Sequence, residues 1–336
     1  MEFAIISHNI DFVTFLMNEY NLEIGLLYCC KYNNLEAFLV YYDQINHVQY
    51  CFFNSLNLGI PSLCKYFLLH GANIDEKDKN EETALHRAAY HNYNITEILI
   101  SPGANVNEKN KNGQTALHIT ARNNCKEITE LLISLGANIN EKDNNGQTAL
   151  HIAMYHIFIE MAELLISHGA NVNDKDNHGN AALQIATHCK CKEMTEFLLS
   201  HGANINEKDN DGKTVLHYAV ISHSKETAKV LFSHGANINE KDNDGKTVLH
   251  YAAINRSKET VKVLLLHGAN VNEKDNDGKT ALHYAAINRS KETVKILLLH
   301  GANVNEIDRN GYSPLYLATL NNNKEIAELL ISYGAK

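Results

Sequence analysis

Two short apolar clusters recur along this chain in a fixed order, with polar stretches between them. Leu85 and Ala88 belong to the first cluster, whose residues fall at i, i+3 and i+4 on one face of a helix and are mostly small. Ile128, Leu131 and Leu132 show the same spacing in the second cluster, after a polar break. Each unit therefore predicts two short helices joined by a loop.

Two sequence markers show that these units form a tandem array. The first marker is Thr-Ala-Leu-His or a close variant, and its copies follow one constant period except that the first step is one residue shorter. They begin at Thr83, Thr115, Thr148, Ala181, Thr214, Thr247, Thr280 and Ser313. The second marker, Gly-Ala-Asn, has the same period and starts at Gly71, Gly103, Gly136, Gly169, Gly202, Gly235, Gly268 and Gly301. Two markers with one period identify a repeat protein.

The markers have mechanical roles within a unit. Thr115 is a suitable N-cap for the first helix, and His118 lies close enough in sequence to bond back to its hydroxyl. Gly136 supplies the positive φ that ends the second helix. Residues 138–147 then form an extended finger with turn chemistry at its tip. One unit is too small to bury its own apolar faces, so stacking on neighbouring units completes the core.

These features closely resemble the ankyrin repeat. The 33-residue period, Gly-x-Thr-Ala-Leu-His, Leu-Leu and Gly-Ala-Asn-Val-Asn all match its pattern. The resemblance implies an all-α fold, an α-solenoid of stacked ankyrin helix-turn-helix repeats with β-hairpin-like fingers. It covers residues 71–336, as about eight 33-residue repeats, and extends more loosely back to Tyr50.

Residues 1–70 carry a degenerate form of the pattern. Three short polar motifs, each followed by an apolar helical run, begin at equal intervals, at Asn9, Asn34 and Gly59. The residues missing from each unit roughly equal one finger, so we expect fingerless helix pairs that continue the stack. This stretch is similar to the helical segment of unknown function that precedes ankyrin arrays in protist protein families, and we expect the chain to begin inside that segment.

Some units depart from the repeat pattern. Glu81 replaces the turn glycine, which predicts an altered first finger, and Pro102 stands in a unit that is one residue short. Ala181 and Gln184 replace both members of the Thr–His pair. We expect two units to be the least stable of the array, those around residues 83–103 and 181–202.

Composition narrows the possible environments and partners. The formal net charge is −9, and lysines alternate with acidic residues instead of forming the basic face that nucleic acid or anionic lipid requires. The sequence contains no run of about 18 apolar residues, so it predicts no membrane span. The seven cysteines are irregularly spaced and no export signal precedes them, which favours reduced thiols in the cytoplasm. We expect a monomer.

Several sequence features imitate sites of chemistry. Twelve of the 19 histidines recur with the period, six in the Leu-His turn and six before glycine, so the structure explains them better than metal ligation does. The His188–Cys191 cluster lacks the second ligand pair of a zinc site, and the acidic finger at residues 207–212 lacks the twelfth-position acid of a calcium loop. No nucleophile stands beside a base outside the repeating frame. We therefore expect no enzyme activity, cofactor or metal.

In the ankyrin architecture, a partner contacts a concave strip formed by the finger tips and the ends of the inner helices. The repeat frame maps this strip onto the two positions that follow the alanine pair of each inner helix. The candidate residues are Tyr90, His91, Arg122, Asn123, Tyr155, His156, His188, Ile221, Ile254 and Ile287, with His178 added from a finger tip. The first residues are aromatic or basic, as binding hot spots are, whereas the isoleucines form either an apolar stripe for a partner or padding between helices.

The sequence thus favours a non-catalytic scaffold that binds another protein through this strip. A structural spacer or cytoskeleton-linking element stays open, because residues 246–278 and 279–311 agree at 28 of 33 positions, surface positions included. An inhibitory or targeting subunit of an enzyme is a third hypothesis. Partner identity is outside what the sequence can give, because fold alone does not assign function.

Overall fold

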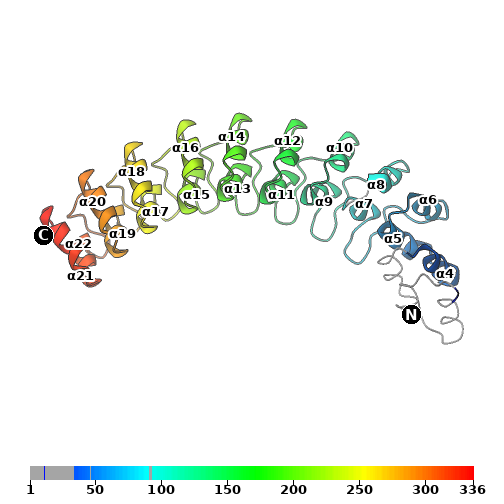
Figure 1. The fold of residues 1–336 in the computed structure, drawn as a ribbon, viewed down its shortest axis with the longest axis horizontal. Coiled ribbons are helices and arrows are strands. Elements are labelled where there is room, and N and C mark those ends of the chain that lie inside the picture. The colour runs from blue at the N-terminus through cyan, green and yellow to red at the C-terminus, as the bar shows by residue number, and fades with distance from the viewer. Residues whose placement is uncertain (1–10, 12–33, 46, 91–92) are drawn as a thin grey trace. The chain divides into compact units, whose positions relative to one another are not determined.

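The computed structural model describes Asp11 and residues 34–45, 47–90 and 93–336, and the regular secondary structure of these residues is entirely helical. This confirms the all-α prediction and the helical-repeat solenoid. The chain forms two compact units, Met1–Ala170 and Asn171–Lys336. Within each unit, the first helices of successive modules form one row and the second helices form another (Figure 1). We call them the inner and the outer helices.

The helices of each unit follow the repeat frame. In the first unit they are α4 (Leu35–Ile45), α5 (Val48–Leu58), α6 (Pro61–Leu69), α7 (Ala84–Ala88), α8 (Tyr93–Ile100), α9 (Ala116–Asn123), α10 (Lys126–Ser134), α11 (Ala149–Tyr155) and α12 (Ile159–Ser167). In the second they are α13 (Ala182–His188), α14 (Lys192–Ser200), α15 (Val215–Ile221), α16 (Lys225–Ser233), α17 (Val248–Ile254), α18 (Lys258–Leu266), α19 (Ala281–Ile287), α20 (Lys291–Leu299), α21 (Pro314–Leu320) and α22 (Lys324–Ser332).

The module of α9 and α10 shows how the sequence builds one repeat. Thr115 is the extended N-cap of α9, and Asn124 ends that helix in the left-handed region with φ 56°. Leu117 and Leu132 are fully buried between the two helices, and α9 also packs against α7 and α11 of the neighbouring modules. The core is thus a series of nearest-neighbour contacts, as the small size of one module requires.

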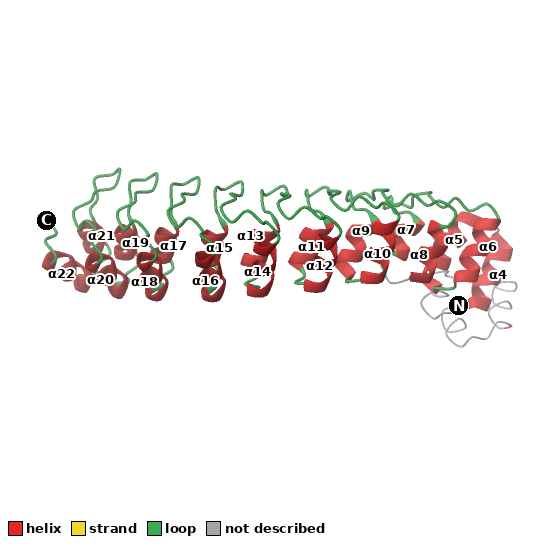
Figure 2. Cartoon of the chain, turned by 90° about the horizontal axis from the view of Figure 1, so that it is seen from above, coloured by secondary structure: helices red, strands yellow, loops and turns green. Residues whose placement is uncertain are grey.

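The fingers are loops, and in each unit they project from the same ends of the helices (Figure 2). At one tip, the Asp143 carboxylate accepts hydrogen bonds from the backbone N–H groups of Asn145 (2.8 Å) and Gln147 (2.9 Å). The next residue of this finger, Asn144, donates its N–H to Asn112 O of the preceding finger at 3.0 Å. A Cβ on Gly113 would lie 2.4 Å from Asn144 Oδ1, so glycine is needed there for close stacking as well as for its positive φ.

Two departures from the repeat pattern have smaller effects than the sequence suggests. The altered geometry expected at Glu81 is wrong: this residue has φ 59°, near the value of the glycines it replaces, and Asp78 Oδ1 still accepts the Asn80 N–H at 2.7 Å. Gln184 keeps half of the lost Thr–His pair, because its Oε1 accepts the Ala181 N–H at 3.2 Å and its Nε2 donates to Glu207 O. The low stability expected of these two units stays a prediction.

Upstream of the first finger, α5 and α6 pack against each other, α5 contacts α7 and α6 contacts α8. Only residues 46 and 47 separate α4 from α5, so no finger precedes α5. The first of the three predicted helical runs lies outside the described residues. The domain division at residue 70 therefore stays a prediction.

Candidate functional site

The recurring turn histidines are used inside the array. His118 Nε2 donates to Gln147 O of the next module at 3.0 Å, since a carbonyl can only accept, and its Nδ1 therefore accepts the Thr115 N–H at 3.1 Å. Burial lowers the pKa of this histidine, so it stays neutral. The same cause lowers the pKa values of four equivalent residues, His86, His217, His250 and His283.

The histidines that precede the Gly-Ala-Asn motif cap the outer helices. Each Nδ1 lies 2.7–2.9 Å from the carbonyl four residues back, as His70 does over Tyr66 O. Among the described residues, no group of three or more His, Cys, Asp or Glu side chains is arranged to hold a metal ion. In the His188–Cys191 cluster, burial raises the pKa of the Cys189 thiol, which disfavours the thiolate that a metal would bind.

A lysine ladder joins successive fingers. In the first unit, Lys109 Nζ lies 2.6 Å from the Glu141 carboxylate and donates to Lys142 O at 3.0 Å. In the second unit, Lys208 repeats both contacts, with Glu240 at 2.8 Å and Lys241 O at 2.9 Å. The hydrogen bond from each lysine lowers the pKa of its glutamate partner. The ladder lysines and glutamates are therefore paired with each other across neighbouring fingers.

In the second unit, half-buried tyrosines pair with buried aspartates. Tyr251 donates its hydroxyl to Asp242 Oδ2 at 2.6 Å and Tyr284 does so to Asp275 at 2.5 Å, while Tyr218 bonds Asp209 in the same way. Burial, followed by the bond to the carboxylate, raises the pKa values of all three tyrosines. These pairs were not predicted from the sequence, although a tyrosine nine residues after the finger aspartate recurs in three modules.

Two equivalent aspartates lack this donor. At the position of the tyrosine stand Ile152, nine residues after Asp143, and Leu317, nine residues after Asp308. The Oδ2 atoms of both aspartates are buried and accept no hydrogen bond from the residues that the structure describes. Lys279 Nζ approaches Asp308 Oδ2 only to 3.9 Å, beyond hydrogen-bond distance. Each of these sites therefore carries an acceptor without a donor.

The predicted strip residues of the first unit lie at the ends of inner helices. Tyr90 follows α7, Arg122 is in the last turn of α9, and Tyr155 ends α11; all three are exposed. His156 is exposed and stacks on Phe158 at 5.4 Å. Asn123 donates its side-chain amide to Ile119 O of its own helix. His91 lies outside the described residues, and the assignment of both residues to the strip stays a prediction.

In the second unit the strip residues differ in exposure. His178 is exposed at a finger tip, and His188 is exposed at the end of α13. The isoleucines that end α15, α17 and α19 are half-buried, whereas Leu320, at the end of the last inner helix, is 63 % exposed. The half-burial of these isoleucines fits the hypothesis that they fill the space between neighbouring inner helices. Whether Ile221, Ile254 and Ile287 bind a partner stays a prediction.

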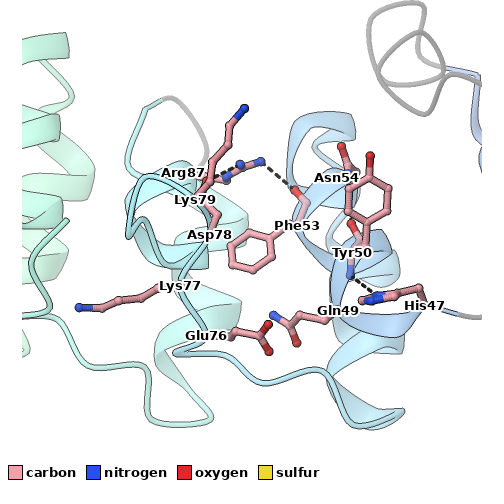
Figure 3. Close-up of a pocket in the computed structure, with 10 residues that line it drawn as sticks. All are labelled: His47, Gln49, Tyr50, Phe53, Asn54, Glu76, Lys77, Asp78, Lys79 and Arg87. Carbon is pink, nitrogen blue, oxygen red and sulfur yellow. Dashed lines mark hydrogen bonds and ion pairs between the residues drawn. The ribbon is translucent and has the colours of Figure 1, made fainter. Parts of the chain in front are cut away.

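A pocket of about 410 Å³ lies beside the first finger, between α5, this finger and α7 (Figure 3). Phe53 forms its floor, with the Arg87 guanidinium 5.2 Å from the centre of the ring. Arg87 is held by Asp78, whose carboxylate lies 2.6 Å away. Glu76 and Gln49 line the same pocket from the finger and from α5. This pocket was not predicted from the sequence, because its lining residues form no recognisable motif.

No described helix is both long and apolar enough to cross a membrane. A family model described as ankyrin repeats (3 copies) matches residues 51–143, 135–209, 203–275 and 257–336, and a model described as a domain of unknown function (DUF3447) matches residues 1–41. No curated protein matches the chain. Both resemblances stated from the sequence are thus confirmed, and the ankyrin matches cover most of the chain. The chain belongs to the ankyrin-repeat family.

Proposed function

We propose that this protein is a non-catalytic scaffold that binds a partner protein through the exposed ends of its inner helices and its finger tips. Ankyrin repeats generally act as protein–protein interaction modules. The observation that carries the proposal is the exposure of Tyr90, Arg122 and Tyr155 at one frame position of three successive modules. Tyrosine and arginine are the residue types that dominate binding hot spots.

The use of the other polar residues supports the same proposal. The turn histidines, the finger lysines and their glutamates are bonded within or between modules, so they have little capacity left for a ligand. The side chains at the ends of the inner helices differ from module to module, and a partner would recognise these side chains. A cytoplasmic location, a monomeric state and the absence of nucleic-acid binding belong to this proposal and rest on the charge and cysteine patterns.

The spacer hypothesis has one observation in its favour. Residues 246–278 and 279–311 agree at 28 of 33 positions, and their strip isoleucines are half-buried. Duplication of this kind lengthens an array without fitting each module to a partner. The second unit would then extend the scaffold, while the varied inner-helix ends of the first unit recognise the partner.

A strip variant of the full chain tests the proposal. Tyr90, Arg122 and Tyr155 are changed together to alanine, and partners are captured from a native lysate and then titrated directly against the purified chain. The matched control changes three first-unit residues on the outer-helix side, Glu130, Leu135 and Glu163, to alanine. Loss of about 100-fold in affinity by the strip variant alone supports recognition by the strip. Equal binding by both variants would leave the spacer hypothesis standing.

A further inference from the structure

In the described part of the chain, six fingers of the array receive a lysine of the preceding finger on their incoming side. The incoming side of the finger after α10 presents the Glu141 carboxylate and Lys142 O, and both contact Lys109 Nζ of the preceding finger. In the second unit, Glu273 and Lys274 O receive Lys241 in the same way, at 2.8 and 2.9 Å. The ammonium group therefore sits between one carboxylate and one backbone carbonyl at each step.

The first finger has this incoming side, and none of the described residues upstream forms a finger before it. Glu76 and Lys77 are the equivalents of the glutamate and lysine that receive the ammonium group, and Lys77 itself points forward to Glu108 at 2.9 Å. Among the described residues, none forms a side-chain hydrogen bond or ion pair with the Glu76 carboxylate, which is exposed. The Glu76 carboxylate and Lys77 O therefore form an acceptor pair that receives no lysine from the described residues, whereas the equivalent pairs Glu141–Lys142 and Glu273–Lys274 each receive one.

Helix α5 replaces part of the missing finger. Gln49 Oε1 accepts the Asn73 N–H at 2.7 Å, and Gln49 Nε2 donates to Asn73 O at 3.0 Å. In the next step of the ladder the acceptor is a finger residue, Asp75, whose Oδ1 receives the Asn105 N–H at 3.1 Å. Gln49 thus satisfies one bond of the incoming side and leaves the lysine position open.

A backbone donor is open at the same edge. Lys111 and Asn144 occupy equivalent finger positions, and each donates its N–H to a carbonyl of the preceding finger at 3.0 Å. The equivalent residue of the first finger is Lys79, whose N–H makes no hydrogen bond within the described part of the chain. The pocket above Phe53 lies along this edge, and the ammonium groups of Lys77 and Lys79 point away from the Phe53 ring (Figure 3).

We propose that this open edge binds a lysine-bearing, finger-like segment of another protein. The lysine ammonium takes the place between Glu76 and Lys77 O, a backbone carbonyl of the segment accepts the Lys79 N–H, and the aliphatic part of the lysine lies over Phe53. A second copy of this chain is not the proposed occupant, because ladder lysines such as Lys109 and Lys208 are already bonded to the following finger, and the finger before α21 carries Ile307 in place of the lysine. The proposal is independent of the strip.

The probe is a synthetic peptide with the sequence of residues 204–213, a finger whose lysine at position 208 occupies the ladder position. A second peptide carries methionine there, which keeps the aliphatic length and removes the charge. Each peptide is titrated into the ¹⁵N-labelled full chain, and the Lys79 amide signal is followed by NMR. We expect the lysine peptide to shift this signal, and the methionine peptide to bind about tenfold more weakly, as for loss of one charge-assisted hydrogen bond.

Protein variants complete the test. Glu76→Gln is expected to weaken binding of the lysine peptide about tenfold and to remove the difference between the two peptides. The control Glu292→Gln, on the exposed side of α20, and the strip variant are both expected to bind as the unchanged chain does. The proposal is overturned if Glu76→Gln leaves the affinity unchanged, if both peptides bind equally, or if the Lys79 signal does not move. Concentration-dependent head-to-tail assembly of the chain alone would overturn the choice of occupant.

Discussion

Replacement of Tyr251 by phenylalanine isolates the contribution of one tyrosine–aspartate pair, in which the aspartate is buried and the tyrosine half-buried. The substitution keeps the ring and removes only the hydroxyl that donates to Asp242 Oδ2 at 2.6 Å. The other oxygen of this aspartate is already held by the N–H groups of Asp244 and Lys246, at 3.0 and 2.8 Å. Asp242 is only 7 % exposed, so water reaches the orphaned oxygen poorly. Leaving a buried acceptor unsatisfied costs about 1–3 kcal/mol, and we expect destabilisation in this range.

Urea denaturation followed by far-ultraviolet circular dichroism measures the change, since the chain has no tryptophan. Amide hydrogen exchange at Asp244 and Lys246 adds a local readout, in which about 1.4 kcal/mol corresponds to tenfold faster exchange. Tyr316→Phe is the matched control, because that tyrosine is exposed and its hydroxyl makes no hydrogen bond among the described residues. If the two variants differ by less than about 0.5 kcal/mol, the pairs are not stabilising elements and the reasoning fails.

Other substitutions address the remaining irregular modules, and each is measured by urea denaturation. Leu317→Tyr places a hydroxyl donor near Asp308 Oδ2, which accepts no hydrogen bond among the described residues, and is expected to stabilise this module by about 1 kcal/mol. No gain in stability would show that the tyrosine hydroxyl does not reach this oxygen. Glu81→Gly removes a left-handed non-glycine residue and is expected to stabilise the first finger by about 0.5–1 kcal/mol, and a loss would mean that the glutamate side chain has a role of its own. Changing Ala181 to Thr and Gln184 to His together restores the Thr–His pair for a gain of about 1 kcal/mol, unless the Gln184 bond to the next module is worth as much. Acid is expected to lower the free energy of unfolding, because burial depresses the pKa values of the turn histidines in the folded state. The stability that these neutral histidines contribute is complete above their ordinary pKa of 6.5, and each histidine loses about 1.4 kcal/mol per pH unit as the pH drops toward its pKa in the folded state. A flat stability profile between pH 7 and 5 would contradict this.

The contacts that sequence could predict are those within one module. The Thr115–His118 pair lies three residues apart at a helix start, and Gly136 ends a helix by its own conformation, so local chemistry determines both. The period then fixes which modules are neighbours. Both features were therefore expected from the pattern and are present in the structure.

The contacts that sequence reasoning missed depend on how one module is offset against the next. Lys109 and Glu141 belong to successive fingers with two helices between them, and nothing local distinguishes this pair from the many other alternating charges of the fingers. Glu81 shows the opposite error, since a single residue suggested distortion while the bonds of Asp78 and the neighbouring fingers hold the turn in place. Interactions across modules outweigh the preference of one residue at such a position.

The two units differ in where their sequence variation is placed, and this difference has a physical consequence. In the second unit, the position nine residues after the finger aspartate is tyrosine in three successive modules, and each hydroxyl bonds a buried carboxylate of its own finger. In the first unit the same position holds Arg87, Ile119 or Ile152, and the ends of the inner helices carry exposed aromatic and basic side chains. Near-identical modules repeat one internally satisfied arrangement, so they add length and leave few polar groups for a partner. Varied modules give up part of that regularity, and the surface they expose instead is where selective recognition can arise.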